Sequence, residues 1–446
     1  MYDVAVIGAG VSGLAVAHGL RRAGRTVVVL EASSRAGGVL QTRERDGFLM
    51  ECAANGFLDK EPATRRLVDA LGLTEALRPA DVSSKKRFIY TKGRLRKVPS
   101  SPPAFLSSDI VPLGAKLRAA MEPFTPRSDA EDESLWDFGK RHLGEGITRV
   151  LFDAVQTGIF AGDAKKLSMA AAFPVIWKLE KKHRSLVLGA IREKPKGSVL
   201  TTFSGGMQTL IDGLVQSVGD SLRLGVRVEA MDRAPDGSWR VKVQGASEEV
   251  RAQRVVLACP ADVSAKLLGP HAPAVADELE AVRYAPVTVV HFGFKKLEPR
   301  PEGFGFLVPA EEKRRVLGVL FISSFFQHRA PEGSTLMTVM MGGARDEAIA
   351  ALSEAEAAKL ARDELSQLIG LQAEPDVVEV VRWRRGIPQY EVGHLARMKR
   401  IDEAMATVPG ITLSGNAYRG VGVNDCVREA ERLVPELVAA VEKSAA

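Results

Sequence analysis

The feature that most constrains the fold is a glycine pattern near the N-terminus. Residues 4–7 form an apolar run that predicts a buried strand, and residues 12–23 are expected to form a helix. Between them, Gly8, Gly10 and Gly13 have the spacing GxGxxG. The first glycine permits a tight turn, the second lets the backbone approach a pyrophosphate, and the third lets the helix pack on the strand. The helix N-terminus then offers free N–H groups to the anion. The pattern therefore predicts a dinucleotide-binding unit.

A second predicted strand, residues 26–30, ends at Glu31. An acidic residue about 20 positions after the glycines is expected to bind a ribose hydroxyl and to disfavour a 2′-phosphate, which argues against NADP. A glycine-rich turn without a ligand is the alternative interpretation of the glycines alone.

A second glycine pair follows in EASSRAGGVLQT, which contains Arg35, Gly37 and Gly38. An NAD site needs neither an arginine nor two further glycines here. FAD is longer, and its flavin must be carried past the first unit. The arrangement resembles the FAD-binding fingerprint of the amine-oxidase-like flavoproteins. FAD is therefore the expected cofactor.

Length and composition limit the other possibilities. The 446 residues suffice for two or three domains, and 46% hydrophobic with 26% charged residues is typical of globular proteins. The net charge of +6 is small and scattered, so nucleic acid is not an expected partner. An acidic small molecule, an anionic membrane surface and a merely solvated basic surface all fit this excess.

Cysteine and histidine usage exclude two further site types. The three cysteines are far apart and odd in number, which predicts no disulfide framework and favours a reducing compartment. The seven histidines lack metal-binding spacing, so no metal is expected. The chain enters a predicted strand directly after Met1 and has no apolar run of about 18 residues. We therefore expect a cytoplasmic protein without a signal peptide or transmembrane helix.

The predicted fold class is α/β plus α+β, in three parts. A Rossmann-like FAD-binding domain is expected to be discontinuous, because nucleotide-type patterns return twice, giving residues 1–80, 216–270 and 401–446. A sheet-bearing substrate domain is expected from residues 81–100, 191–215 and 271–400. Its strands are interrupted by a helix near residues 353–369.

Residues 101–190 are expected to form a mostly helical insertion. Segments such as IVPLGAKLRAAMEPF mix apolar residues with lysine and arginine. Amphipathic helices of this kind lie on membrane surfaces, although packing on neighbouring domains fits the same pattern. The insertion is therefore a candidate membrane-binding part.

The tail GITLSGNAYRGVGVNDC predicts a strand, a glycine loop and the start of a long helix, with Asn424 and Asp425 as candidate N-caps. A helix N-terminus here would approach the flavin pyrimidine and stabilise negative charge on it. An ordinary loop around Gly415, Gly420 and Gly422 is the alternative.

Five segments together resemble the oxygen-dependent protoporphyrinogen oxidases, most closely the myxobacterial enzymes. They are IFAGDAKKLSM, FPVIWKLE, FSGGMQTL, WRRGIPQY and GNAYRGVGVNDC, and the similarity runs from Val6 to Glu431. The resemblance implies a discontinuous FAD domain, a substrate domain and a helical membrane-binding insertion. It also implies the six-electron oxidation of protoporphyrinogen IX to protoporphyrin IX in heme biosynthesis, with O2 reduced to H2O2.

The resemblance assigns FAD contacts to the glycine loop, the two segments that follow it, one strand and the tail. These residues are Gly8, Ala9, Gly10, Val11, Ser12, Gly13, Glu31, Ala32, Arg35, Gly37, Gly38, Val39, Ala53, Ala54, Asn55, Gly56, Gly415, Val421, Gly422 and Val423. Val228 matches a strand position whose backbone holds the adenine.

The resemblance also assigns residues to the substrate. Arg87 matches an arginine that pairs with a propionate, and Asn55 matches a position beside the active site. Gly158 lies in the segment near which the substrate ring is covered. The apolar walls that clamp the tetrapyrrole match Leu307, Leu320 and Met340.

The chemistry of a porphyrinogen leads to similar residues. This large apolar molecule needs a wide apolar slot with a cation at the rim for its propionates, and a guanidinium suits a carboxylate. The strands after residue 303 add Phe304 and Phe306 to the wall. A solvated Arg87 and plain core residues are the alternatives. Hydride is expected to leave a methylene bridge for the flavin, and we name no catalytic residue.

Three positions depart from the family pattern. Leu395 stands where many relatives have tryptophan, so a direct flavin contact is not carried over. Met340 stands where some relatives have phenylalanine, so ring stacking is not carried over either. Ala53 replaces a glycine of several relatives, which narrows the space near the flavin.

Three other functions stay open. Oxidation of coproporphyrinogen III to coproporphyrin III would involve four propionates and thus more basic residues. Amine oxidases and carotenoid desaturases share the FAD motifs but not the tail. A non-catalytic FAD-containing tetrapyrrole carrier is the third alternative. The resemblance further implies peripheral attachment to the inner face of the cell membrane, and it allows a homodimer and diphenyl-ether-type inhibitors in the substrate slot.

Overall fold

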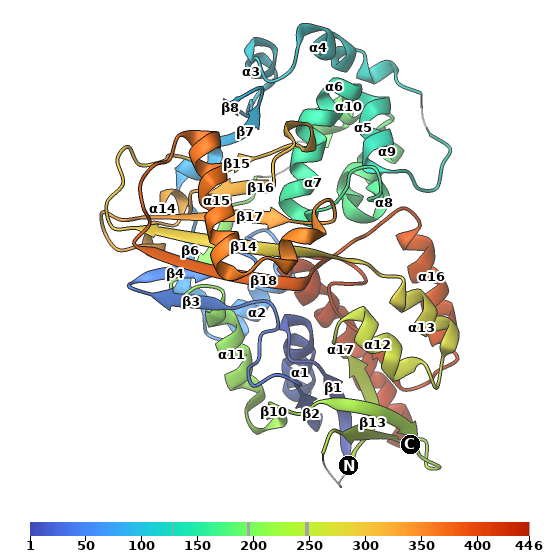
Figure 1. Ribbon diagram of the computed structural model, residues 1–446. Coiled ribbons are helices and arrows are strands. Elements are labelled where there is room, and N and C mark those ends of the chain that lie inside the picture. The colour runs from blue at the N-terminus through green and yellow to red at the C-terminus, as the bar shows by residue number, and fades with distance from the viewer. Residues whose placement is uncertain (127, 194–196, 246–248, 446) are drawn as a thin grey trace.

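The computed structural model describes residues 1–126, 128–193, 197–245 and 249–445 (Figure 1). The glycine motif and both termini lie at one end of an elongated molecule, a large sheet occupies the middle, and the helical insertion forms the other end. The residues expected to bind cofactor and substrate are thereby distributed over three stacked parts.

A seven-stranded sheet forms the end with the termini. Its order is β10-β2-β1-β13-β12-β11, with β19 beside β13. The neighbours of β1 are parallel, and the VVVL run of β2 is fully buried, as expected for strands covered on both faces. The strands are β1 (Tyr2–Ile7), β2 (Val27–Leu30), β10 (Leu222–Arg223), β11 (Val228–Arg233), β12 (Trp239–Val243), β13 (Val250–Leu257) and β19 (Ile411–Leu413).

Helices from distant segments cover both faces of this sheet. One core contains side chains of α1 (Val11–Arg22), α2 (Pro62–Ala70), α11 (Gln208–Val218) and α17 (Val423–Ala445). The opposite core contains side chains of α12 (Ala261–Leu268), α13 (Pro273–Glu280) and α16 (His394–Met405). The discontinuous nucleotide domain expected from the sequence therefore has a physical basis, because each segment buries its apolar face on one sheet.

Three borders of the expected domains differ from this packing. Residues 191–215 and 271–400 were expected in the substrate domain, yet α11, α13 and α16 pack on the nucleotide sheet. An amphipathic helix shows the same apolar stripe whichever sheet it covers, so the sequence pattern could not choose between the two.

The second seven-stranded sheet lies in the middle of the molecule, in the order β18-β14-β17-β16-β15-β7-β8 (Figure 1). One of its faces is covered by α15 (Glu354–Ile369), which begins with a capping box formed by Ser353 and Glu356. The helix expected near residues 353–369 is thereby confirmed. The strands are β7 (Arg87–Thr91), β8 (Arg94–Lys97), β14 (Tyr284–Phe294), β15 (Gly305–Leu307), β16 (Val316–Leu320), β17 (Thr335–Gly342) and β18 (Val377–Pro388).

The helical insertion follows β8. Its helices are α3 (Pro102–Ser107), α4 (Leu113–Ala120), η3 (Glu122–Phe124), α5 (Leu135–Leu143), α6 (Glu145–Ile147), the π-helical η4 (Thr148–Phe152), α7 (Asp153–Phe160), α8 (Met169–Ala172), α9 (Pro174–His183) and α10 (Leu186–Glu193). The helical character expected for residues 101–190 is confirmed in the described part of the insertion.

Short elements connect these parts. Two small sheets comprise β3 (Thr42–Arg45) with β4 (Phe48–Glu51), and β5 (Phe57–Leu58), β9 (Leu200–Phe203) and β6 (Leu77–Pro79). The other short helices are η1 (Thr74–Ala76), η2 (Val82–Lys85), η5 (Gly219–Ser221), η6 (Ala310–Glu312), α14 (Ile322–Phe325), η7 (Gln327–Arg329) and η8 (Glu347–Ala351).

The expected N-caps of the last helix are both wrong. α17 begins at Val423, so Asn424 and Asp425 already lie inside it. The Asn424 side chain instead accepts a hydrogen bond from Thr64 Oγ1 and donates one to the carbonyl of Leu58. These contacts attach the start of α17 to α2 and β5, which local sequence could not reveal.

Candidate functional site

The glycine loop lies between β1 and α1 with its backbone exposed to a ligand. Gly8 has φ +105°, and a Cβ there would lie 2.7 Å from the carbonyl oxygen of Ala258. No described atom lies within 4 Å of the Cβ position of Gly10, so this glycine faces open space. Gly10 also gives the N-terminus of α1 no side-chain cap, and the first turn of α1 has no acidic residue. The free N–H groups there suit a phosphate.

The second glycine pair lies directly beside this loop. Gly10 and Gly37 form a parallel bridge, and the Gly37 N–H donates to the Ala9 carbonyl at 2.8 Å. The guanidinium of Arg35 donates to the carbonyls of Ala36 and Gly38, at 3.2 and 2.8 Å. Arg35 therefore shapes the loop that carries the glycines. The two motifs, separate in sequence, form one surface.

Glu31 connects the glycine loop to the segment that leads into β11. One carboxylate oxygen accepts from Ala9 N–H at 2.7 Å, and the other accepts from Ser33 N–H at 2.9 Å. The Glu31 carbonyl accepts from Val226 N–H at 2.8 Å, two residues before Val228 begins β11. The residue expected at the ribose is thus bonded to the segment that leads into Val228, the residue expected at the adenine.

Three further stretches meet near the other end of the loop. Val11, Ala54 and Val423 belong to one apolar cluster, although they come from α1, the segment after β4 and the start of α17. Asn55 and Gly56 are half-buried beside them. Val421 points into a different cluster, which contains Phe160 and Tyr390. The loop between β19 and α17, residues 415–422, is called the tail loop. It therefore lies between the glycine loop and the insertion.

These features fit a dinucleotide with a second ring system. The open side of Gly10 and the uncapped N-terminus of α1 suit the pyrophosphate, and the Glu31 carboxylate suits the ribose. The stretch from Ala53 to Gly56 and the tail loop lie where a longer cofactor would continue. The residues present would therefore hold FAD.

Four of the expected substrate residues lie on one face of the middle sheet. Cross-strand pairs place Leu307, Gly318 and Met340 in one row, because Leu307 pairs with Gly318 and Gly318 with Met340. The adjacent row on the same face contains Arg87, Gly305 and Leu320. Side chains two residues apart on a strand share a face, so the three apolar residues and the arginine form one surface.

Helix α7 of the insertion lies against this face. A Cβ at Gly158 would lie 3.1 Å from a methyl carbon of Leu307, so Gly158 directly faces the predicted slot wall. Val155 and Ile159 are 48% and 46% exposed, and Val155 lies one turn before Gly158 on the same side of the helix. These two apolar residues were missed from the sequence, where their spacing matched an ordinary amphipathic helix.

Arg87 lies at the edge of the slot face. Its guanidinium stacks on the ring of Phe304 at 4.9 Å, and Phe304 in turn stacks on Phe325 at 4.6 Å. Arg87 is exposed, and no carboxylate of the described residues forms an ion pair with it. The stack orients the charge while leaving its hydrogen-bond donors free for an anion.

Phe306 does not line the slot as the sequence suggested. It pairs with Phe88 and Val319 in the opposite phase of the strands and is 1% exposed. Its ring packs in the core beneath α15, beside Met337 and Val339. Alternation along β15 assigns Leu307 and Phe306 to opposite faces, and only the sheet register shows which face is which.

Polar residues missed from the sequence hold these parts together. Asp153 of α7 accepts two hydrogen bonds from Arg345 at 2.7 and 2.9 Å, and one from Ala310 N–H at 2.7 Å. The side chains of Tyr390 and His394 contact the tail loop. Buried polar side chains are not distinguishable from solvated ones in a single sequence, so no local signal identified them.

Comparisons with known proteins agree with this geometry. Residues 11–437 match the family of flavin-containing amine oxidoreductases. The mitochondrial protoporphyrinogen oxidase of Nicotiana tabacum is 34% identical over 94% of this chain and 91% of the relative. The coproporphyrinogen III oxidase of Bacillus subtilis is 30% identical over 97% of each chain. The crystal structure of an Exiguobacterium protein assigned as a protoporphyrinogen oxidase superposes with a TM-score of 0.87 at 26% identity, covering 99% of both chains.

Proposed function

The chain belongs to the family of flavin-containing amine oxidoreductases, and from this premise we propose that it oxidises protoporphyrinogen IX to protoporphyrin IX in heme biosynthesis. Its cofactor is FAD, and O2 is reduced to H2O2. The observation that carries the proposal is Arg87, a guanidinium without a carboxylate partner among the described residues, at the edge of an apolar sheet face. This arrangement matches a large apolar ring system with propionates on one side.

When bound, FAD supplies the two-electron acceptor for a hydride from a methylene bridge. The protein binds and orients the substrate. Leu307, Leu320 and Met340 offer an apolar wall, and the exposed apolar side of α7 faces it and excludes water. Arg87 fixes the orientation of the ring through a propionate, which reduces the number of unproductive poses.

Coproporphyrinogen III is the second substrate candidate, because the Bacillus subtilis relative is named for it. The slot face favours the first candidate. In β7, β15, β16 and β17, all of them described, Arg87 is the one lysine or arginine in the two rows of the slot face. Four propionates would need more cations than this surface supplies.

A direct assay separates the candidates. The purified holoenzyme is given each porphyrinogen in air, and porphyrin fluorescence and H2O2 are followed together. We expect a higher kcat/KM for protoporphyrinogen IX. A higher value for coproporphyrinogen III would reverse the assignment, and binding without turnover of either would support the carrier alternative.

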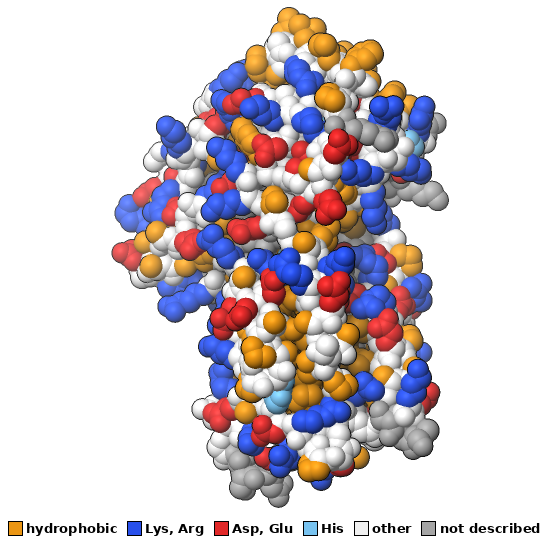
Figure 2. Space-filling model, turned by 90° about the vertical axis from the view of Figure 1, so that its right-hand side faces the viewer, with side chains coloured by type: hydrophobic (Ala, Val, Ile, Leu, Met, Phe, Trp, Pro, Cys, Tyr) orange, Lys and Arg blue, Asp and Glu red, His pale blue; other side chains and the backbone are white. Residues whose placement is uncertain are grey.

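We also propose that the insertion attaches the protein peripherally to the anionic inner face of the cell membrane. Five apolar residues at the outer end are largely exposed, with Phe124 at 84% and Leu113 at 69% (Figure 2). Exposed apolar groups of this size next to cations suit the membrane interface. This apolar tip consists of Leu106, Leu113, Leu117, Met121 and Phe124.

A group of cations adjoins the apolar tip. A cavity of about 510 Å³ is lined by Phe124 of the tip together with Arg184 and Arg192. No carboxylate of the described residues forms an ion pair with either arginine. Such a group attracts anionic lipids. This basic corner consists of Lys178, Lys181, Lys182, Arg184 and Arg192, all exposed.

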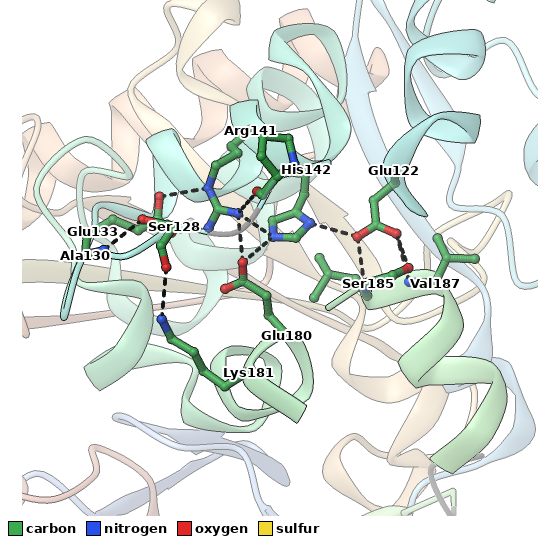
Figure 3. A network of polar contacts seen from close by, with 12 residues as sticks. Glu122, Ser128, Ala130, Glu133, Arg141, His142, Glu180, Lys181, Ser185 and Val187 are labelled. Atoms are coloured by element: carbon green, nitrogen blue, oxygen red, sulfur yellow. Dashed lines mark hydrogen bonds and ion pairs between the residues drawn. The ribbon is translucent and has the colours of Figure 1, made fainter. Parts of the chain in front are cut away.

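A buried polar network holds the basic corner in place (Figure 3). The Glu122 carboxylate lies 2.7 Å from His142 Nδ1 and accepts from Ser185 Oγ at 2.5 Å and Leu186 N–H at 2.7 Å. His142 Nε2 lies 3.2 Å from Glu180 on the other side. Burial alone would raise the pKa of Glu122, but these hydrogen bonds lower it to about 2. The network therefore joins η3, α5, α9 and α10.

None of the helices in the described ranges has the length and apolar character needed to cross a membrane. The attachment that we propose uses the apolar tip and the basic corner at the surface of the bilayer. Formation of a homodimer and binding of diphenyl-ether-type inhibitors in the substrate slot stay predictions.

A further inference from the structure

The tail loop between β19 and α17 is held by one tyrosine hydroxyl. Tyr390 is 2% exposed, and its hydroxyl donates to the Asn416 carbonyl at 2.6 Å. The same oxygen accepts from Gly420 N–H at 2.7 Å. Burial raises the pKa of Tyr390, so the hydroxyl keeps its proton and can serve both bonds. One side chain from the segment after β18 thus closes the loop from Asn416 to Gly420.

His394 adds a second support. Its ring stacks on Tyr390 with centroids 4.0 Å apart and an interplanar angle of 13°. His394 Nε2 lies 3.0 Å from the Tyr418 carbonyl, and since a carbonyl only accepts, Nε2 carries the hydrogen. His394 is 1% exposed, and its Nδ1 has no partner among the described residues. Two stacked rings therefore bind three backbone groups of one loop.

The segment that carries Tyr390 also forms hydrogen bonds with the insertion. Gln389 donates to the Phe160 carbonyl at 2.9 Å, where α7 ends. Ser168 N–H donates to the Tyr390 carbonyl at 2.8 Å. The rings of Phe160 and Tyr390 lie 5.9 Å apart, and Val421 of the tail loop packs in their cluster. Side chains outside the tail loop therefore fix it at a junction of three parts.

We infer that Tyr390 and His394 are positioning residues that fix the tail loop, residues 415–422, against the flavin. The inference rests on the flavin site of the proposed function but not on the identity of the substrate. The substrate wall lies on the middle sheet, and neither ring belongs to it. Loss of the hydrogen bonds that Tyr390 or His394 forms with the loop backbone should therefore change the flavin environment and kcat. It should leave KM nearly unchanged.

Tyr390→Phe tests this inference in the holoenzyme. The variant keeps the ring stack and removes both hydroxyl bonds. We expect amide hydrogen exchange in residues 415–422 to rise about tenfold, because a hydrogen bond of this kind shifts a local opening equilibrium by about that factor. The absorption spectrum and the two-electron midpoint potential of the bound flavin should shift with it.

The matched control is Tyr284→Phe. The Tyr284 hydroxyl also accepts a backbone N–H, from Ala261 at 2.9 Å, and among the described residues no hydrogen bond joins it to the tail loop. We expect no change in exchange at residues 415–422 in this variant. The inference would be overturned if Tyr390→Phe showed the same hydrogen exchange at residues 415–422, the same flavin spectrum and the same midpoint potential as Tyr284→Phe.

Two further measurements keep the test decisive. Should Tyr390→Phe not yield folded holoenzyme, His394→Phe keeps the stack and releases only the Tyr418 carbonyl, with the same readouts and the same expected direction. Exchange, spectrum and potential need no substrate. If neither porphyrinogen is oxidised while the tail loop still loosens, the proposed function fails and the positioning role stands.

Discussion

Arg329 of η7 and Glu51 of β4 form a buried ion pair. Arg329 Nη1 lies 2.5 Å from Glu51 Oε1, and the two side chains are 1% and 3% exposed. Glu51 also accepts from Met207 N–H at 2.8 Å, and Arg329 donates to Thr202 at 2.6 Å. Burial raises the pKa of Glu51, although Arg329 and the Met207 N–H oppose this shift. The pair fixes β4, which ends two residues before the stretch from Ala53 to Gly56 that we expect to contact the flavin.

Arg329→Met should therefore destabilise the protein strongly. The substitution leaves the Glu51 carboxylate buried without its cation, which costs about 3–5 kcal/mol. Urea unfolding of the holoenzyme measures the change in the free energy of unfolding. Adding Glu51→Gln to Arg329→Met should recover part of the loss, because the uncompensated charge is gone.

A surface pair provides the control for this prediction. Arg362 and Glu374 form an exposed ion pair, so Arg362→Met should change the free energy of unfolding by about 1 kcal/mol or less. An effect of Arg329→Met as small as that of Arg362→Met would show that the buried pair contributes little.

Arg87→Ala should weaken substrate use far more than FAD binding. A charge-assisted hydrogen bond contributes about 1.5–3 kcal/mol, so its loss should lower kcat/KM roughly 10- to 100-fold. Arg87→Lys should restore only part of this loss, because an ammonium lacks the planar fork. Steady-state kinetics with protoporphyrinogen IX measure both variants, and the flavin spectrum should stay unchanged.

Lys85→Ala removes a neighbouring exposed cation and serves as the control. A wild-type KM in Arg87→Ala would disprove the propionate contact. Lys85 and Arg94 would then be the next residues to test, although Arg94 already pairs with Asp109.

FAD should be bound non-covalently. The three thiols are poor nucleophiles at neutral pH, because burial raises the pKa of Cys52, Cys259 and Cys426 to about 11 in each case. Precipitation of the holoenzyme with acid should release the yellow flavin into the supernatant. Colour that stays in the washed pellet would indicate a covalent bond.

Binding to anionic liposomes should depend on the basic corner. Each cation near an anionic surface contributes about 1 kcal/mol, so Arg184→Ala combined with Arg192→Ala should weaken sedimentation with phosphatidylglycerol vesicles roughly 30-fold. Salt should weaken the wild-type interaction in the same direction. Removal of two cations from α15, Lys359→Ala with Arg362→Ala, should have no such effect. Wild-type protein that fails to bind any vesicle would contradict the membrane proposal.

His394 should make the holoenzyme less stable in mild acid. Burial is the main cause that lowers the pKa of His394 from 6.5 to about 4, and Arg397 and Arg419 lower it further while the Tyr418 carbonyl and Asp132 oppose them. The unfolded chain binds a proton below about pH 6.5, whereas the folded protein does not until about pH 4. The contribution is therefore complete above pH 6.5 and is lost as the pH falls to about 4, up to about 3 kcal/mol.

The difference between wild type and His394→Phe isolates this contribution. Thermal unfolding between pH 7 and pH 4.5 should show a steeper loss of stability in the wild type. Parallel curves would mean that His394 does not titrate in this range.

The sequence by itself determined the chemistry at the start of the chain. Gly8 could be assigned because a turn with positive φ favours glycine, and Gly10 because a pyrophosphate needs close approach to the backbone. Both requirements are local to the loop. Periodicity likewise identified α15 and the helical insertion, because local spacing of apolar residues suffices to specify a helix.

Only the tertiary structure decided which residues share a surface. Leu307 and Phe306 are neighbours of similar character, yet one faces α7 and the other lies beneath α15, because the strand register fixes the face. Tyr390 and Gly420 are 30 residues apart, and their bond exists only because β18 and the tail loop meet in space. Backbone conformation is set by local sterics, whereas hydrogen bonds and faces between distant segments depend on how the sheets and helices pack.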